Sequence, residues 1–201
     1  MNPASMNPAG MNPAGMGQAD RDQAGQEAFS IPALPAELLD RPLDYLAADH
    51  ERHRAVCAFL KRVVRDGAIR GASAGAVAGC LNKEFPLHLA DEHGALYPAL
   101  VRRSRDDEDF VAALQRIAAA QDAAVASLTP VVSGLKAVSA LPAARLTPQL
   151  AQALDEYVRE EEQRLAFENA VILRIADVRL RKSDIEAIRG DMKARRGVGG
   201  R

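Results

Sequence analysis

Aromatic residues are scarce in this chain of 201 residues: they make up 4% of it, and tryptophan is absent. Strands are enriched in aromatic and β-branched residues, whereas alanine and leucine, which dominate the apolar residues of this chain, favour helices. We therefore expect an all-α fold. The length suits one domain with a sizeable hydrophobic core.

The chain also lacks a surplus of charge and any long hydrophobic run. Its net charge is −1, which gives no electrostatic basis for binding nucleic acid or an anionic membrane. No stretch approaches the length of a membrane span, and the N-terminus has neither the basic start nor the apolar run of a signal peptide. We therefore expect a cytoplasmic protein with no nucleic-acid partner and no membrane partner.

Cysteine is almost absent as well. The only two cysteines, Cys57 and Cys80, match neither the spacing of a zinc finger nor that of a redox motif. Both fall within helical patterns, so we expect them to be small buried apolar residues in a reducing compartment. A disulfide is not expected.

The first 30 residues differ in composition from the rest. Residues 1–15 read MNPASMNPAGMNPAG, a five-residue repeat rich in proline, glycine and asparagine, and a polar stretch follows to about Gln26. Such a segment cannot bury enough apolar surface to order itself. We expect a disordered low-complexity tail over residues 1–30 and one folded domain over residues 40–196.

Within the folded part, apolar residues recur at steps of three and four, the period of an amphipathic helix. This pattern predicts long helices over about 43–67, 72–103, 107–138 and 148–175, and a short one from about 183. Expected N-terminal signals are Asp40, Thr147 before Pro148, and a capping box from Ser183 to Glu186. Four long helices joined by short loops pack most simply as an antiparallel up-and-down four-helix bundle, here with a short C-terminal fifth helix.

Polar residues occupy inward positions near the middle of the long helices. Antiparallel packing should bring these positions to one level of the bundle. Because burying an unpaired charge is costly, the residues must pair with one another or coordinate a metal ion. The residues expected to meet at this level are His50, His88, Glu92, Gln121, Arg164 and Glu168; His53 and Glu161 also lie on the inward faces of their helices.

Helices two and four also contain similar segments, which share Leu, Ala and Glu at equivalent positions: HLADEHGALYP at 88–98 and RLAFENAVILR at 164–174. Together with DHERHRAVC at 49–57, these segments make the chain resemble the hemerythrin-like, or HHE cation-binding, family, over residues 43 to about 196. The resemblance implies a four-helix bundle that holds two iron ions through histidines and bridging carboxylates. Carried over by position, it assigns His50, His88, Glu92 and Glu168 as metal ligands.

Two positions depart from the pattern of this family. Gln121 stands in place of the third-helix histidine, and Arg164 in place of the fourth-helix histidine. A glutamine can ligate weakly through its amide oxygen, but an arginine has no lone pair to offer and is always charged. Two interpretations stay open: a single or asymmetric iron centre that recruits His53, or a metal-free site in which Arg164 pairs with Glu161, Glu168 or Glu92.

These interpretations lead to two kinds of function. In the first, the protein is a non-haem iron protein, with one or two ions, that binds or senses a small oxidant such as oxygen, nitric oxide or peroxide. In the second, a metal-free bundle acts in interaction or regulation. An enzyme is not expected, because the sequence has no catalytic triad, phosphate loop or dinucleotide motif, and an oxidant-degrading activity would have to come from the metal. The sequence does not indicate whether the bundle self-associates.

Overall fold

A computed structural model of the chain describes residues 28–198, apart from the side chains of residues 120–124, 126 and 127. Two expectations fall outside this description. The expected tail over residues 1–30 lies almost wholly before the described residues, and Gln121 is among the side chains that are left out.

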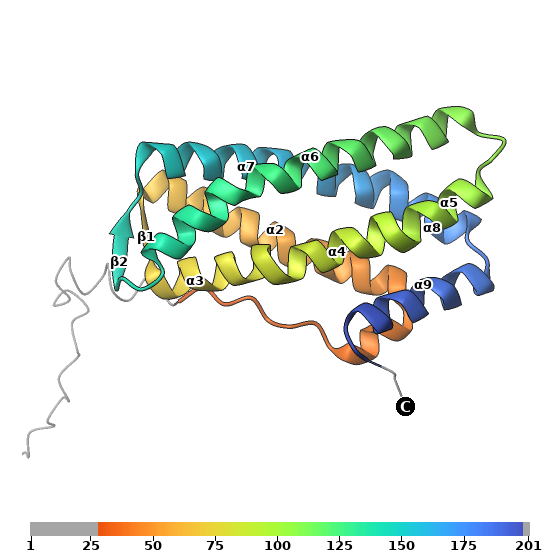
Figure 1. Cartoon of the computed structure of the whole chain (residues 1–201), viewed down its shortest axis with the longest axis horizontal. Helices are drawn as coiled ribbons and strands as arrows, with labels where there is room; N and C mark the ends of the chain where they lie inside the picture. The colour runs from red at the N-terminus through yellow and green to blue at the C-terminus, as the bar shows by residue number, and fades with distance from the viewer. Residues whose placement is uncertain (1–27, 199–201) are drawn as a thin grey trace, which may run out of the picture.

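Four long helical rods pack side by side and run alternately up and down, which confirms the expected all-α four-helix bundle (Figure 1). A short 3₁₀ helix precedes the first rod, and a short fifth helix follows the fourth. In chain order the elements are η2 (Ala36–Asp40), α2 (Pro42–Asp66), β1 (Ala68–Arg70), α3 (Gly71–Gly79), η3 (Cys80–Glu84), α4 (Phe85–Asp91), η4 (Glu92–Leu96), α5 (Tyr97–Arg103), α6 (Glu108–Val138), β2 (Ala143–Arg145), α7 (Pro148–Phe167), η5 (Glu168–Ile172), α8 (Leu173–Arg179) and α9 (Lys182–Arg195).

The second and fourth rods are not uniform α-helices. Single π-helical turns, η3 and η4, join α3, α4 and α5 into one rod, and a third π turn, η5, joins α7 to α8. Pro86 and Pro98 each lie at the start of the α-helix that follows a π turn. A proline cannot donate to the carbonyl four residues earlier and its ring clashes with it, and a π turn at that point widens the helix to accommodate both effects.

The starts of the helices agree only in part with the expected signals. The hydroxyl of Thr147 accepts a hydrogen bond from the Leu150 amide at 3.2 Å, as expected for an N-cap. Asp40 was wrongly expected to cap the first helix: the cap position belongs to Arg41, and Asp40 instead pairs with Lys193 at 2.6 Å. The expected capping box from Ser183 to Glu186 is also wrong, because α9 begins earlier, at Lys182.

A short antiparallel ribbon, which the sequence pattern did not indicate, closes one end of the bundle. In it β1 pairs with β2, with Ile69 opposite Ala144. Each strand has only three residues, too few for an alternating apolar pattern to be recognisable. The ribbon joins the loop after the first rod to the loop before the fourth.

Two hydrophobic clusters fill the bundle, one toward the ribbon and one toward α9. The first includes Cys57, Leu60 and Leu135, and the second includes Leu46, Leu96 and Met192. Both Cys57 and Cys80 are buried, as expected. Between the clusters, at mid-length, lies a layer of buried polar side chains. It contains His50, His53, His88, Glu92, Glu161 and Glu168, which the sequence placed on inward faces, and also Asp49 and Arg52.

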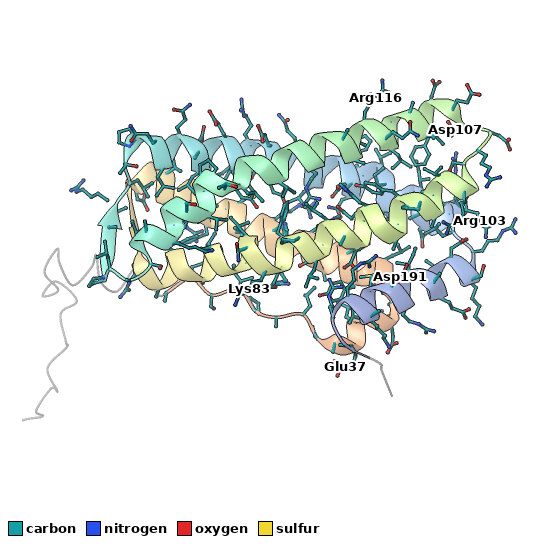
Figure 2. The ribbon with its side chains drawn as sticks, viewed as in Figure 1. Glu37, Lys83, Arg103, Asp107, Arg116 and Asp191 are labelled. Atoms are coloured by element: carbon teal, nitrogen blue, oxygen red, sulfur yellow. The ribbon has the colours of Figure 1, made fainter. Side chains whose placement is uncertain are left out.

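Charged side chains cover the outside of the bundle, as Lys83, Arg116 and Asp191 illustrate (Figure 2). Over residues 28–198, none of the helices combines the length and the apolar character that crossing a membrane requires.

The close approach of two loops at the ribbon end predicts the effect of a small substitution. A Cβ atom at Gly71 would lie 1.9 Å from the carbonyl oxygen of Leu141, whereas a Cβ atom at Gly79 would meet nothing within 4 Å. Gly71→Ala should therefore lower the free energy of unfolding by about 1–3 kcal/mol, measured by urea denaturation, because the backbone must shift. Gly79→Ala, the control in an open helical position, should raise it by about 0.5–1 kcal/mol. Equal stability of the two variants would contradict this packing.

Candidate metal centre

Two π turns place carboxylates in the polar layer. Glu92 is the first residue of η4 and Glu168 is the first residue of η5. In each rod a second polar residue lies four positions earlier, His88 in one and Arg164 in the other, so both pairs face the same side of their rod. The echo between the two sequence segments thus corresponds to a repeated local geometry, and π turns are frequent at functional sites.

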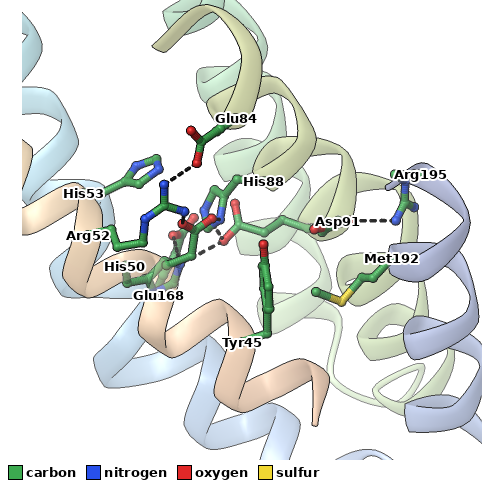
Figure 3. A network of polar contacts seen from close by, with 12 residues as sticks. Tyr45, His50, Arg52, His53, Glu84, His88, Asp91, Glu168, Met192 and Arg195 are labelled. Atoms are coloured by element: carbon green, nitrogen blue, oxygen red, sulfur yellow. Dashed lines mark hydrogen bonds and ion pairs between the residues drawn. The ribbon is translucent and has the colours of Figure 1, made fainter. Parts of the chain in front are cut away.

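Four residues form a compact group that could hold a metal ion: His50, His88, Glu92 and Glu168. One ligand atom from each lies within 4.8 Å of all the others. Nε2 of His50 lies 3.2 Å from Oε1 of Glu92 and 3.3 Å from Oε2 of Glu168, and Nε2 of His88 lies 3.3 Å from Oε1 of Glu92. All four side chains are at most 1% exposed. Figure 3 shows His50, His88 and Glu168 among their polar neighbours.

These separations suit a single metal ion. Ligands bound at about 2.1 Å in a tetrahedral arrangement lie roughly 3.4 Å from one another, close to the distances between these nitrogen and oxygen atoms. Two imidazoles and two carboxylates also form a donor set that borderline divalent ions accept. The residues of the group therefore fit one cation.

Outer contacts orient two of the candidate ligands. Nδ1 of His88 lies 3.1 Å from Oδ2 of Asp49, whose other oxygen accepts from Arg52 at 2.9 Å. The hydroxyl of Tyr97 donates to Oε1 of Glu168 at 2.9 Å. Such contacts fix the direction of a ligand and are typical of metal centres. The sequence reasoning missed both Asp49 and Tyr97; a carboxylate directly before His50 was the one available signal.

His53 lies beside this group but not in it. Its Nδ1 atom lies 2.7 Å from Oε1 of Glu161, and its ring centre is 5.0 Å from that of His88. Nε2 of His53, Nδ1 of His50 and the hydroxyl of Tyr157 are buried and have no hydrogen-bond partner among the described protein atoms. The structure therefore brings His53 close to the site without placing it among the ligand atoms.

Arg164 contacts the carboxylates of the site from within the polar layer. Its Nε and Nη2 atoms donate to both oxygens of Glu161, at 2.8 and 2.6 Å. Its Nη1 atom donates to Glu168 at 2.6 Å and to Glu92 at 3.2 Å, and it lies 3.3 Å from Nε2 of His88. The guanidinium group thus contacts all three carboxylates that the sequence suggested as its partners, and it adjoins three of the four candidate ligands.

The close packing of charged groups in the polar layer shifts their pKa values. Burial lowers the pKa of His88, but the charge of Glu92 and hydrogen bonds to Asp49 and Glu92 outweigh it and raise this pKa to about 10. Burial and the neighbouring charge of Glu92 raise the pKa of Glu168 to about 8. Burial alone would raise the pKa of Asp49, yet its contacts with His88 bring it to about 2. His88 and Glu168 must each lose a proton before they can bind a metal ion.

The same effects act on Glu161 and Arg164. Burial opposes ionisation of the Glu161 carboxyl, but the charge of Arg164 and its two hydrogen bonds hold the pKa of Glu161 below its ordinary value. Burial likewise opposes the charged form of Arg164, and the carboxylates of Glu161 and Glu168 outweigh it and raise the pKa of the guanidinium. The pair is therefore fully charged at neutral pH.

A model of the hemerythrin HHE cation-binding domain matches residues 41–166 of the chain. The match runs from the start of α2 almost to the end of α7, so it contains His50, His88, Glu92 and Arg164. Glu168 and the whole of α9 lie beyond it. Comparison with curated proteins gives no match, and neither does comparison with solved structures.

The contacts of Arg164 predict a large loss of stability when its charge is removed. In a chelator solution that keeps metal away, Arg164→Met should lower the free energy of unfolding by about 3–5 kcal/mol, because it leaves buried carboxylates without their cation. Arg116→Met, at an exposed position of α6, should change it by less than about 0.5 kcal/mol. If urea denaturation gave the two variants the same stability, the ion-pair network would not be what holds this layer together.

Proposed function

Because the chain belongs to the hemerythrin HHE cation-binding family, we propose that it binds one non-haem iron ion and that this centre binds or senses a small oxidant such as oxygen, nitric oxide or peroxide. The observation that carries the proposal is the buried group of His50, His88, Glu92 and Glu168, with its donor atoms spaced for a single cation. Imidazole and carboxylate together are a donor set that iron uses.

The proposal is for one ion because of Arg164. Its guanidinium carries a fixed positive charge and lies 2.6 Å from Glu168 and 3.3 Å from His88. Two like unit charges about 4 Å apart repel by about 4 kcal/mol at an effective dielectric constant of 20, and more for a divalent ion. Glu161 is not free to bind a second ion, because it already accepts two hydrogen bonds from Arg164.

The residues around the site have separate tasks in this proposal. His50, His88, Glu92 and Glu168 would hold the ion, while Asp49 and Tyr97 orient His88 and Glu168. When bound, iron supplies open coordination positions and redox chemistry for a small oxidant. The two hydrophobic clusters keep bulk water from the layer on both sides.

Arg164 adds a property that depends on its charge. Its N–H groups lie beside the proposed site, and charge-assisted hydrogen bonds from a guanidinium favour ligands that carry negative charge. Among the small oxidants considered, peroxide fits this environment best. We infer a binding or sensing protein rather than an enzyme, since the sequence carries no nucleophile with a base to activate it.

A second candidate function is that of a metal-free bundle that acts in interaction or regulation. The observation in its favour is that Nη1 of Arg164 already adjoins Glu92, Glu168 and His88. In this candidate the guanidinium compensates the buried carboxylates in place of a metal ion. The two candidates differ in one measurable quantity, the amount of metal that the purified protein holds.

Metal analysis after anaerobic loading with ferrous iron tests the proposal. The wild-type protein should retain about one iron ion per chain after desalting, and His50→Ala or Glu168→Gln should lose most of it, because each removes a ligand from a four-ligand site. Glu160→Gln is the matched control for Glu168→Gln: it makes the same change at an exposed position of α7 and should leave the iron content unchanged. A wild-type protein without stoichiometric metal would reject the proposal in favour of the metal-free candidate.

Arg164→His separates the effect of the guanidinium from that of the remaining ligands. The change removes the repelling charge and adds an imidazole, so the iron content should rise from about one ion to about two per chain. An unchanged content of one ion would mean that Arg164 does not limit the number of ions. A rise from none to one would show that the guanidinium keeps metal out of the wild-type protein.

A further inference from the structure

Helix α9 lies outside the part of the chain that the family model matches, yet it packs against the turn that carries Glu92. Ile188 and Met192 on α9 are fully buried in the same hydrophobic cluster as Ala95 and Leu96 of η4. Figure 1 shows α9 lying along the outside of the bundle at the end away from the ribbon. Helix α9 therefore covers the π turn from one side.

Asp91, the residue directly before Glu92, is the point where α9 holds this turn. Its carboxylate is 0% exposed. Nη1 of Arg195 donates to Oδ1 of Asp91 at 2.8 Å, and Nη2 of Arg196 donates to Oδ2 at 2.6 Å. Both oxygens of a fully buried carboxylate are thus held by two arginines at the C-terminal end of α9, Arg195 and the residue that follows the helix, Arg196. Figure 3 shows the pair of Asp91 with Arg195.

Arg196 also reaches the first rod. Its Nε atom donates to the hydroxyl of Tyr45 at 3.2 Å, and its guanidinium lies over the Tyr45 ring, 4.8 Å from the centre. Its remaining nitrogen, Nη1, donates to the carbonyl of Met192 at 3.2 Å. Tyr45 lies on α2 one turn before Asp49, which orients His88. One guanidinium therefore ties together the two rods that carry His50, His88 and Glu92.

The fit of Arg195 depends on a glycine in the π turn. A Cβ atom at Gly94 would lie 2.9 Å from Nη2 of Arg195, so the side chain of Arg195 lies directly against the backbone of η4. Glycine permits this close approach because it has no side chain. Arg195 thus packs closely against the π turn at Gly94, two residues after Glu92.

We propose that Arg195 and Arg196 are positioning residues of the metal centre: they hold Asp91, and through it the π turn that carries Glu92, in register with the first rod. The expected effect on metal affinity rests on the function proposed above. The clamp, meaning the ion pairs of Arg195 and Arg196 with Asp91 that hold η4, does not depend on that function. Partners that orient ligands from outside the coordination sphere change metal affinity by about 10–100-fold when they are removed. A free α9 would also leave the charge of Asp91 buried and unpaired.

The experiment compares three variants of the full-length chain. Arg195→Met with Arg196→Met removes both ion pairs while keeping apolar side-chain volume. Arg196→Lys keeps a positive charge near Asp91 but cannot contact Asp91 and Tyr45 in the same way. Lys182→Met is the control, since this lysine lies on α9 with its side chain 91% exposed.

Two readouts are measured on each variant. Without metal, hydrogen exchange of the amides of residues 92–97 should become about tenfold faster in the double variant, faster to a smaller extent in Arg196→Lys, and unchanged in Lys182→Met. With metal, ferrous iron or cobalt should bind about 10–100-fold more weakly to the double variant. The visible spectrum of bound cobalt should shift as well, because the position of Glu92 changes. If the double variant lost its helical circular dichroism, the same readouts on Arg196→Lys would decide.

The two readouts keep the clamp and the proposed function apart. A wild-type protein that binds no metal would reject the proposed function, and the exchange rates would still test the clamp. Exchange rates equal to those of the wild type would overturn the clamp. Faster exchange with unchanged cobalt affinity and spectrum would overturn the role of these arginines at the metal centre.

Discussion

The structure depends on the need to neutralise carboxylates that are buried at the middle of a helical bundle. Glu92, Glu161 and Glu168 are each at most 4% exposed and lie between two hydrophobic clusters, from which the hydroxyl of Tyr97 donates to Glu168. In that environment an uncompensated charge costs several kcal/mol. The guanidinium of Arg164 pairs with all three carboxylates. Imidazole nitrogens of His50, His53 and His88 also lie close to carboxylate oxygens in the layer. The same need makes the layer a site at which a metal ion is stabilised.

Backbone geometry delivers these groups to one place. The π turns at Glu92 and Glu168 open the α-helical spacing in two rods at the level of the candidate ligands. A π turn contains one residue more than an α-helical turn. The extra residue redirects the side chains of the turn, and such turns recur at functional sites. The ligands of the proposed centre thus come from rigid helices, and Asp49, Tyr97 and Asp91 fix their orientation through contacts outside the group.

Much of the architecture could be predicted from the sequence. The period of the apolar residues identified the helices and their packing, because a long amphipathic helix carries its pattern in every turn. The level at which His50, His88, Glu92 and Glu168 meet followed from their mid-helix positions. The resemblance to a family then identified which of the polar core residues were candidate ligands, and the substitution at Arg164 raised the question of how many ions can bind.

The remainder depends on contacts between residues far apart in the chain. The ribbon between β1 and β2 has no pattern of its own, and α2 begins at Pro42 after Arg41, one residue later than a cap at Asp40 would place it. No local signal links Asp91 to Arg195 and Arg196, more than a hundred residues later. No local signal links Tyr97 to Glu168 either. These contacts exist only once the rods are packed.

The proposed centre consists of one metal ion in the polar layer, beside the guanidinium of Arg164. Anomalous diffraction at the iron edge, from crystals of the iron-loaded protein, locates each bound iron ion. We expect one anomalous peak per chain, within bonding distance of His50, His88, Glu92 and Glu168, with Arg164 still paired to Glu161. Two peaks per chain, or none at this position, would contradict this expectation.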